Sequence, residues 1–166
     1  MSVLDGAFWV VSLVLLASGV TKLLDPAPLG TALVELGVLP AGEPARGALA
    51  GRVLGAIELL VGGAALVVGG RLTAVLVTLS YLVFTVIVAA SWRRGLRSCG
   101  CFGASSSPPA ALHVALNAVS TCVALGAVLA PAPAVADGLD ASTWNPALVV
   151  ALVLAGAVGV VVADTR

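Results

Sequence analysis

Five long apolar runs constrain the fold of this chain more than any other feature of its sequence. They cover approximately residues 6–24, 50–69, 72–92, 110–130 and 147–163. An α-helix needs about 20 mostly apolar residues to cross a bilayer, and none of these runs shows the strict alternation of a membrane β-strand. The sequence therefore predicts an all-α, polytopic bundle of five transmembrane helices, folded as a single integral-membrane domain over residues 1–166.

The composition agrees with a membrane location. Apolar residues make up 60% of the chain and charged residues only 10%, whereas soluble domains have roughly 45–50% and 25%. The eight basic and eight acidic residues cancel, so the charge argues against a nucleic-acid surface. The predicted main partner is the lipid bilayer.

The connector after the first run has its own pattern. Residues 28–38, with the sequence PLGTALVELGV, are apolar but too short to span, and Pro40 follows them. Such a segment is typical of a re-entrant or interfacial helix. We therefore expect one short helix between the first and second spans.

Two other residue types bear on how the spans are placed. Trp9, Trp92 and Trp144 fall near the ends of predicted spans, where an amphipathic ring suits the headgroup region. Gly51 and Gly55 lie four residues apart, a spacing that lets two membrane helices approach closely.

The basic residues divide unequally between the two sides of a five-span topology. Only Arg71 lies on one side, and the other side carries Lys22, Arg46, Arg52, Arg93, Arg94, Arg97 and Arg166. By the positive-inside rule the larger group faces the cytoplasm. We expect a bacterial cytoplasmic membrane protein with its N-terminus outside and its C-terminus inside.

The motif SCGCFG at residues 98–103 lies between the third and fourth runs. Of the three cysteines, only Cys99 and Cys101 are close enough to form a local pair. Their Cα atoms lie at most about 7 Å apart and a disulfide requires roughly 4.4–6.8 Å, so the chain must bend, which Gly100 permits. Three arginines lie within six residues of Cys99 and favour the reactive thiolate: Arg93, Arg94 and Arg97. The pattern predicts a strained disulfide that exchanges readily.

Other interpretations of the motif stay open. Cysteines are often simply small buried hydrophobes. Two thiolates with His113 could also hold a soft ion such as Cu(I), although tetrahedral zinc would need a fourth ligand. Cys122 is nine positions after His113, which places it on the opposite helix face near mid-membrane, and we interpret it as a packing residue.

Four polar residues should lie near the thiols. Counted along their helices from the side of the motif, Lys22, Glu58, His113 and Asn117 fall within about 12 Å of that membrane surface. His113 and Asn117 share a helix face because they are four apart. Glu58 and Lys22 are expected to form the buried ion pair that a membrane carboxylate usually requires. These groups either line a pocket or serve only as interhelical contacts.

The predicted site follows from these patterns. Cys99, Cys101 and His113 would carry the chemistry, with His113 moving the proton that thiol exchange requires. The supporting residues would be Lys22, Glu58, Arg94, Arg97, Gly100 and Asn117. No metal is assigned, and no cofactor is assigned beyond a quinone as a candidate electron acceptor.

The chain also resembles a known family. SCGCFG after RRGLR, followed by a helix that bears Asn117, is similar to the signature of the methylamine-utilisation protein MauE family. A broader resemblance, over residues 6–130, is to small MauE/DoxX-like helical membrane proteins, through SGVTKLLDP and through Glu58 in GAIELLVGG. It implies a four-helix DoxX-like core with one added helix.

The resemblance implies a function. Members of the family are expected to act in methylamine metabolism, in the maturation of the disulfide-rich methylamine dehydrogenase, beside a thioredoxin-like partner. The chain would thus be a membrane thiol-disulfide redox or maturation factor, a possible oxidoreductase. That role belongs on the oxidising side of a membrane, whereas the charge count places the thiols on the reducing side. The alternatives are a metal-binding or small-molecule-binding membrane protein and a structural subunit of a larger complex.

Overall fold

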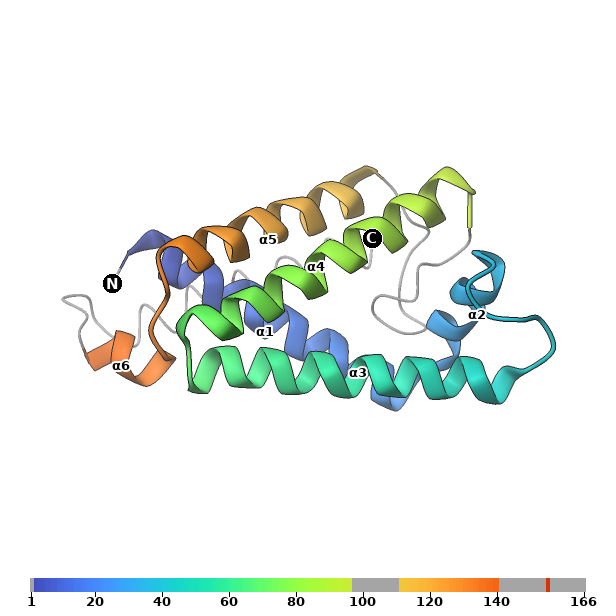
Figure 1. The fold of residues 1–166 in the computed structure, drawn as a ribbon, viewed down its shortest axis with the longest axis horizontal. Coiled ribbons are helices and arrows are strands. Elements are labelled where there is room, and N and C mark those ends of the chain that lie inside the picture. Colours follow the sequence, from blue (N-terminus) through green and yellow to red (C-terminus); the bar gives the residue numbers. More distant parts are fainter. Residues whose placement is uncertain (1, 97–110, 141–154, 156–166) are drawn as a thin grey trace.

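The computed structural model describes residues 2–96, 111–140 and 155, and within these ranges the regular structure is entirely helical (Figure 1). The helices are α1 (Val3–Leu24), α2 (Ala27–Glu35), α3 (Pro44–Val67), α4 (Gly70–Arg93), α5 (Ala111–Leu129) and α6 (Val135–Asp140). Helices α1, α3, α4 and α5 are long and apolar enough to cross a membrane. The all-helical membrane fold is confirmed for this part of the chain. The predicted fifth span, 147–163, lies outside the described residues except for position 155.

The four long helices run alternately in opposite directions along one bundle (Figure 1). At one end α1 finishes, α3 starts, α4 finishes and α5 starts, with α2 beside them. We call this the loop end, because α4 ends and α5 begins there. The opposite end carries the start of α1, the turn between α3 and α4, and α6.

Glycines bring α1 and α3 into close contact. A Cβ atom built on Gly19 would lie 2.6 Å from the carbonyl oxygen of Gly55. A Cβ on Gly51 would lie 2.6 Å from the carbonyl oxygen of Pro26, just before α2. Backbone atoms occupy the space that larger residues would need. The close approach predicted from the spacing of Gly51 and Gly55 is confirmed.

The tryptophans do not all lie where a headgroup anchor would. Trp9 is only 1% exposed, and its Nε1 donates a hydrogen bond to the carbonyl of Pro133 at 3.1 Å. The prediction for Trp9 is therefore wrong. The segment before α6 closes over this end of the bundle and provides the acceptor that a buried indole needs. Trp92, at the end of α4, is exposed as expected, and Trp144 lies outside the described residues.

The connector contains the expected short helix, with somewhat different bounds. Helix α2 ends at Glu35, and the chain then turns through Gly37, which has a positive φ of 73°. A Cβ on Gly30 would lie 2.7 Å from the Cα of Gly47, so α2 packs tightly on the first turns of α3. Its re-entrant or interfacial placement in the bilayer stays a prediction.

Candidate functional site

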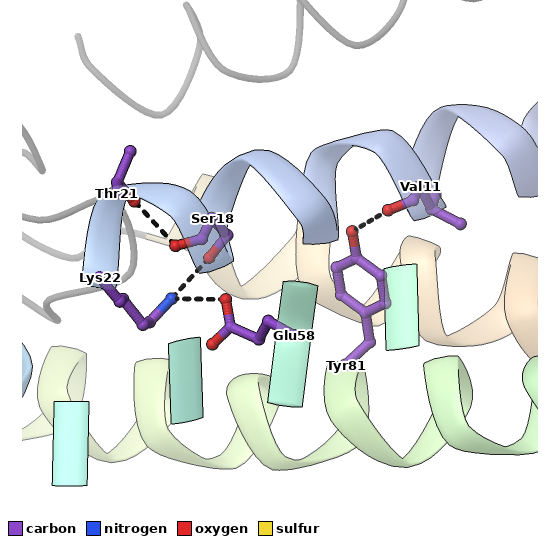
Figure 2. Close-up of polar contacts among 6 residues, drawn as sticks. All are labelled: Val11, Ser18, Thr21, Lys22, Glu58 and Tyr81. Carbon is purple, nitrogen blue, oxygen red and sulfur yellow. Dashed lines mark hydrogen bonds and ion pairs between the residues drawn. The ribbon is translucent and has the colours of Figure 1, made fainter. Parts of the chain in front are cut away.

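A buried ion pair links α1 and α3 inside the bundle. Nζ of Lys22 lies 3.0 Å from Oε2 of Glu58, and the two side chains are 1% and 0% exposed. Nζ also donates a hydrogen bond to Oγ of Ser18 at 2.5 Å (Figure 2). The predicted pairing of Lys22 with Glu58 is confirmed, and its burial is almost complete.

The local sequence explains how these groups meet. Ser18 and Lys22 are four residues apart and therefore lie on the same face of α1, one turn from each other. Gly55 lies one turn before Glu58 on α3, and a Cβ there would be only 3.0 Å from Cβ of Lys22. Because no side chain separates the two helices at Gly55, the lysine reaches the carboxylate directly.

Aromatic side chains of α4 complete the surroundings of the pair. The ring of Phe84 lies 5.1 Å from Nζ of Lys22, within the range of a cation–π contact. Tyr81 packs edge-on against Phe84, with ring centroids 6.2 Å apart. The hydroxyl of Tyr81 donates to the carbonyl of Val11 at 2.6 Å (Figure 2). Three helices thus contribute to the environment of this ion pair.

Two buried oxygen atoms in this half of the bundle lack a hydrogen-bond partner. They are Oε1 of Glu58 and Oγ of Ser91, and neither finds one among the residues that the structure describes. Both residues are 0% exposed. Buried polar atoms in native proteins are nearly always satisfied, so each such atom calls for a bound water or a functional explanation.

Helix α5 brings two of the predicted site residues to the loop end. His113 is buried, and Asn117 is half-buried one turn later. Nδ2 of Asn117 donates to the carbonyl of His113 at 2.8 Å, so this hydrogen bond stays within α5. Further along, the hydroxyls of Thr121 and Thr85 lie 3.5 Å apart and connect α5 to α4.

The predicted pocket wall of Glu58, His113 and Asn117 stays a prediction. A cavity of about 380 Å³ lies between α2 and the first turns of α3. Its lining includes Glu35 and Glu43 and none of those three residues.

The supporting arginines and the thiols are only partly described. Arg94 follows α4 and is exposed, and its Nη1 donates to the carbonyl of Glu35 at 3.1 Å. This contact fastens the end of α4 to the end of α2. The remaining predicted members of the thiol site lie outside the described residues: Arg97, Cys99, Gly100 and Cys101.

Cys122 is exposed on α5, whereas His113 is buried. The prediction that the two residues occupy opposite faces is confirmed. The interpretation of Cys122 as a packing residue is not supported by the described bundle, because the same half-turn that separates it from His113 directs it away from α1 and α4.

The depth of the pair depends on where α3 enters the membrane. This helix begins at Pro44, six residues before the predicted start, so Glu58 lies about 21 Å from the first residue of the helix. Arg46 and Arg52 are exposed on the intervening turns, which is expected of a segment outside the hydrocarbon. Measured from Arg52, Glu58 is about 9 Å deeper. The depth of the pair below the membrane surface stays a prediction.

Three residues of this environment were not anticipated from the sequence: Ser18, Phe84 and Ser91. Ser18 had a local signal, since a hydroxyl four residues before a buried lysine is placed to accept from it. Phe84 and Ser91 had no such signal, because the sequence of the mostly apolar helix α4 does not show which of its faces meets a charge on another helix.

Four membrane-length helices with an ion pair enclosed among three of them define a polytopic helical integral membrane protein. The chain belongs to a family within this class. The family model described as "Methylamine utilisation protein MauE" matches residues 2–130, which include α1 to α5 and the SCGCFG motif. No curated protein and no solved structure matches the chain.

Proposed function

We propose that the protein is a membrane thiol-disulfide redox or maturation factor in which Cys99 and Cys101 exchange electrons with a partner protein. The observation that carries this proposal is that α4 ends and α5 begins at the loop end, with Cys99 and Cys101 between them in the sequence. His113 is buried at the same end. Membership of the MauE family supports the same assignment.

The described residues hold both ends of the thiol segment in place. Leu96 is described, and Cys99 follows it three residues later in the sequence, within about 10 Å of chain. The hydrogen bond from Arg94 to Glu35 fixes the point of departure. Ala111 starts α5 at the other end of the segment. A dithiol on such a short tether stays close to the loop end while it meets a partner.

Thiol exchange supplies a simple reaction for this arrangement. A thiolate of the pair attacks a disulfide of the partner, one S–S bond breaks as another forms, and the leaving sulfur takes the electron pair. The second cysteine then resolves the mixed disulfide. We propose a thioredoxin-like protein or a dehydrogenase subunit as the partner. In the reverse direction a partner thiolate attacks the Cys99–Cys101 disulfide and leaves the pair reduced. A quinone is then the proposed acceptor that reoxidises the pair within the membrane.

We expect Cys99 and Cys101 to form a reversible disulfide in membranes that contain the full-length protein. Alkylation with and without reductant, followed by mass spectrometry, should detect it. Cys99→Ser, which removes the proposed resolving thiol, should make a mixed disulfide with the partner persist on Cys101. The matched control is Cys122→Ala, which changes an exposed thiol on α5 and should leave exchange nearly intact.

Two results would contradict the proposal. One is that both thiols stay free under every redox condition in which the protein is active and no single variant traps a partner. The other is equal loss of exchange from all three cysteine variants. Binding of Cu(I) by the free thiols in a titration would then favour a metal-binding protein, and unreactive thiols would favour a structural subunit.

We further propose that the loop end faces the cytoplasm. Lys22, Arg46, Arg52 and Arg93 belong to the helix ends gathered there, whereas Arg71 starts α4 at the opposite end. Reporter fusions after residue 166 and within 131–146 should place the C-terminus inside and the 131–146 segment outside. A C-terminus outside would reverse this orientation and place the thiols on the oxidising side.

A further inference from the structure

We propose that Glu58 is an internal proton acceptor for thiol exchange, and that Ser91 lies on the path by which the proton reaches it. The inference rests on the proposed function. It is carried by two buried oxygen atoms that have no hydrogen-bond partner among the described residues, Oε1 of Glu58 and Oγ of Ser91. Ionisable residues inside a membrane commonly mark proton relays.

The two oxygens of Glu58 have different surroundings. Oε2 lies 3.0 Å from the ammonium of Lys22, so that atom is engaged. Oε1 is buried and accepts no hydrogen bond from any described residue. An ion pair needed only for structure is expected to satisfy both oxygens, because an unsatisfied polar atom inside a protein lowers stability. The bare oxygen is the atom at which a proton, delivered through water, would bind.

Water is a general donor for a buried oxygen such as Oε1. Buried waters typically bridge polar groups of this kind. The predicted fifth span, 147–163, contains only Ala, Val, Leu and Gly, so its side chains include no hydrogen-bond donor.

Ser91 lies between the ion pair and the end of α4. Phe84, which contacts Lys22, is seven residues before Ser91, and this separation is two helical turns or about 10 Å. Both side chains are buried and therefore face the interior of the bundle. Two residues after Ser91 the helix ends at Arg93, from which the chain continues to the thiols. A water-bridged hydroxyl at this position would divide the path of a proton from the thiols to Glu58 into shorter steps.

The exchange reaction supplies and consumes the proton. Attack by a cysteine requires loss of its S–H proton, and the departing thiolate of the partner takes one up. In the proposed step the carboxylate of Glu58 accepts the first proton at Oε1 and later returns it. The proton transfer itself moves no electrons. Over the full exchange the Cys99–Cys101 pair loses two electrons and the partner's disulfide gains them, as one S–S bond forms and the other breaks.

The charged and titratable groups facing Glu58 permit this role. Lys22 of α1 holds Oε2, and the hydroxyl of Tyr81 on α4 donates to Val11 and is therefore engaged elsewhere. His113 of α5 is buried at the loop end and belongs to the same half of the bundle. Neither Lys22 nor Tyr81 blocks Oε1 with a hydrogen bond.

The test measures exchange between the full-length protein in membranes and a soluble aromatic disulfide, across pH. Glu58→Gln should slow exchange at neutral pH by about tenfold or more and make the rate rise with hydroxide concentration, because general-base assistance is lost. Ser91→Ala should cause a smaller loss in the same direction. The matched control is Ser12→Ala, since Ser12 is equally buried but its hydroxyl already bonds to the carbonyl of Phe8 at 2.8 Å.

If Glu58→Gln fails to accumulate, Ser91→Ala provides the test. The hydroxyl of Ser91 makes no hydrogen bond to a described residue, so its removal should have little effect on folding. Wild-type rates and an unchanged pH profile in the folded variants would overturn the proton role while leaving the thiol function standing. Exchange that survives loss of both Cys99 and Cys101 would instead overturn the thiol function itself. A carboxyl band that appears in infrared difference spectra on acidification, and is absent from Glu58→Gln, would support proton binding by Glu58 directly.

Discussion

Lys22→Met is expected to lower the free energy of unfolding by about 3–5 kcal/mol. The substitution keeps an unbranched side chain of similar length but removes the ammonium that lies 3.0 Å from Glu58. A carboxylate that is 0% exposed is then left without its counter-charge, and the desolvation of that charge is no longer offset. Equilibrium unfolding of the protein in detergent micelles, followed by circular dichroism against denaturant concentration, would measure the loss.

Two comparisons make this prediction specific. Arg46→Met breaks the ion pair between Arg46 and Glu43, whose side chains are 63% and 45% exposed, respectively. Because this pair is exposed, the substitution should lower the free energy of unfolding by less than about 1 kcal/mol. The double variant Lys22→Met/Glu58→Met should recover most of the stability, since it leaves no buried charge. Equal losses from Lys22→Met and Arg46→Met would show that burial does not govern the effect. Recovery of stability without recovery of thiol exchange would separate the structural and chemical roles of the pair.

Gly55→Ala is expected to destabilise the bundle by about 1–3 kcal/mol, although alanine is the better helix former. The added Cβ would lie 2.8 Å from the carbonyl oxygen of Gly19 and 3.0 Å from Cβ of Lys22. Because the first of these atoms belongs to the backbone, α1 must move away from α3. The same movement would separate Lys22 from Glu58, so thiol exchange should also change if the ion pair supports it.

Gly63→Ala on the same helix is the matched control. A Cβ at Gly63 meets no described atom within 4 Å, so the substitution should be neutral or stabilise the helix by up to about 1 kcal/mol. Both variants can be compared by unfolding in the same detergent. A loss from Gly63→Ala as large as that from Gly55→Ala would indicate that the α1–α3 contact is not the sensitive interface.

Individual residues show how far the sequence could predict the site. The pairing of Lys22 with Glu58 was predictable because a bilayer offers no other stable state for two isolated charges. The burial of Trp9 was not predictable, since a tryptophan near a helix end suits the headgroup region and a covered bundle end equally well. Trp9 is buried because the segment that includes Pro133, which is distant in sequence, folds over it.

The unsatisfied oxygens illustrate the same limit for the site itself. Ser91 sits in an apolar helix where a serine commonly bonds to its own backbone, as Thr85 and Ser80 do. Only the packed structure shows that its hydroxyl is buried and lacks a partner among the described residues. The choice between Oε1 and Oε2 of Glu58 is likewise made by the position of Lys22 on another helix.

The class of the protein follows from its apolar runs alone. Apolar runs of membrane length define helices, because each helix satisfies its own backbone hydrogen bonds and needs no information from elsewhere in the chain. Which faces of α1, α3 and α4 meet is seen only once the helices are packed. Gly19 and Gly55 allow the close approach that encloses Lys22 and Glu58. The apolar pattern of these helices does not specify which faces pack together. In a membrane no hydrophobic effect orients one helix against another, so van der Waals fit and a few polar contacts select the faces that meet.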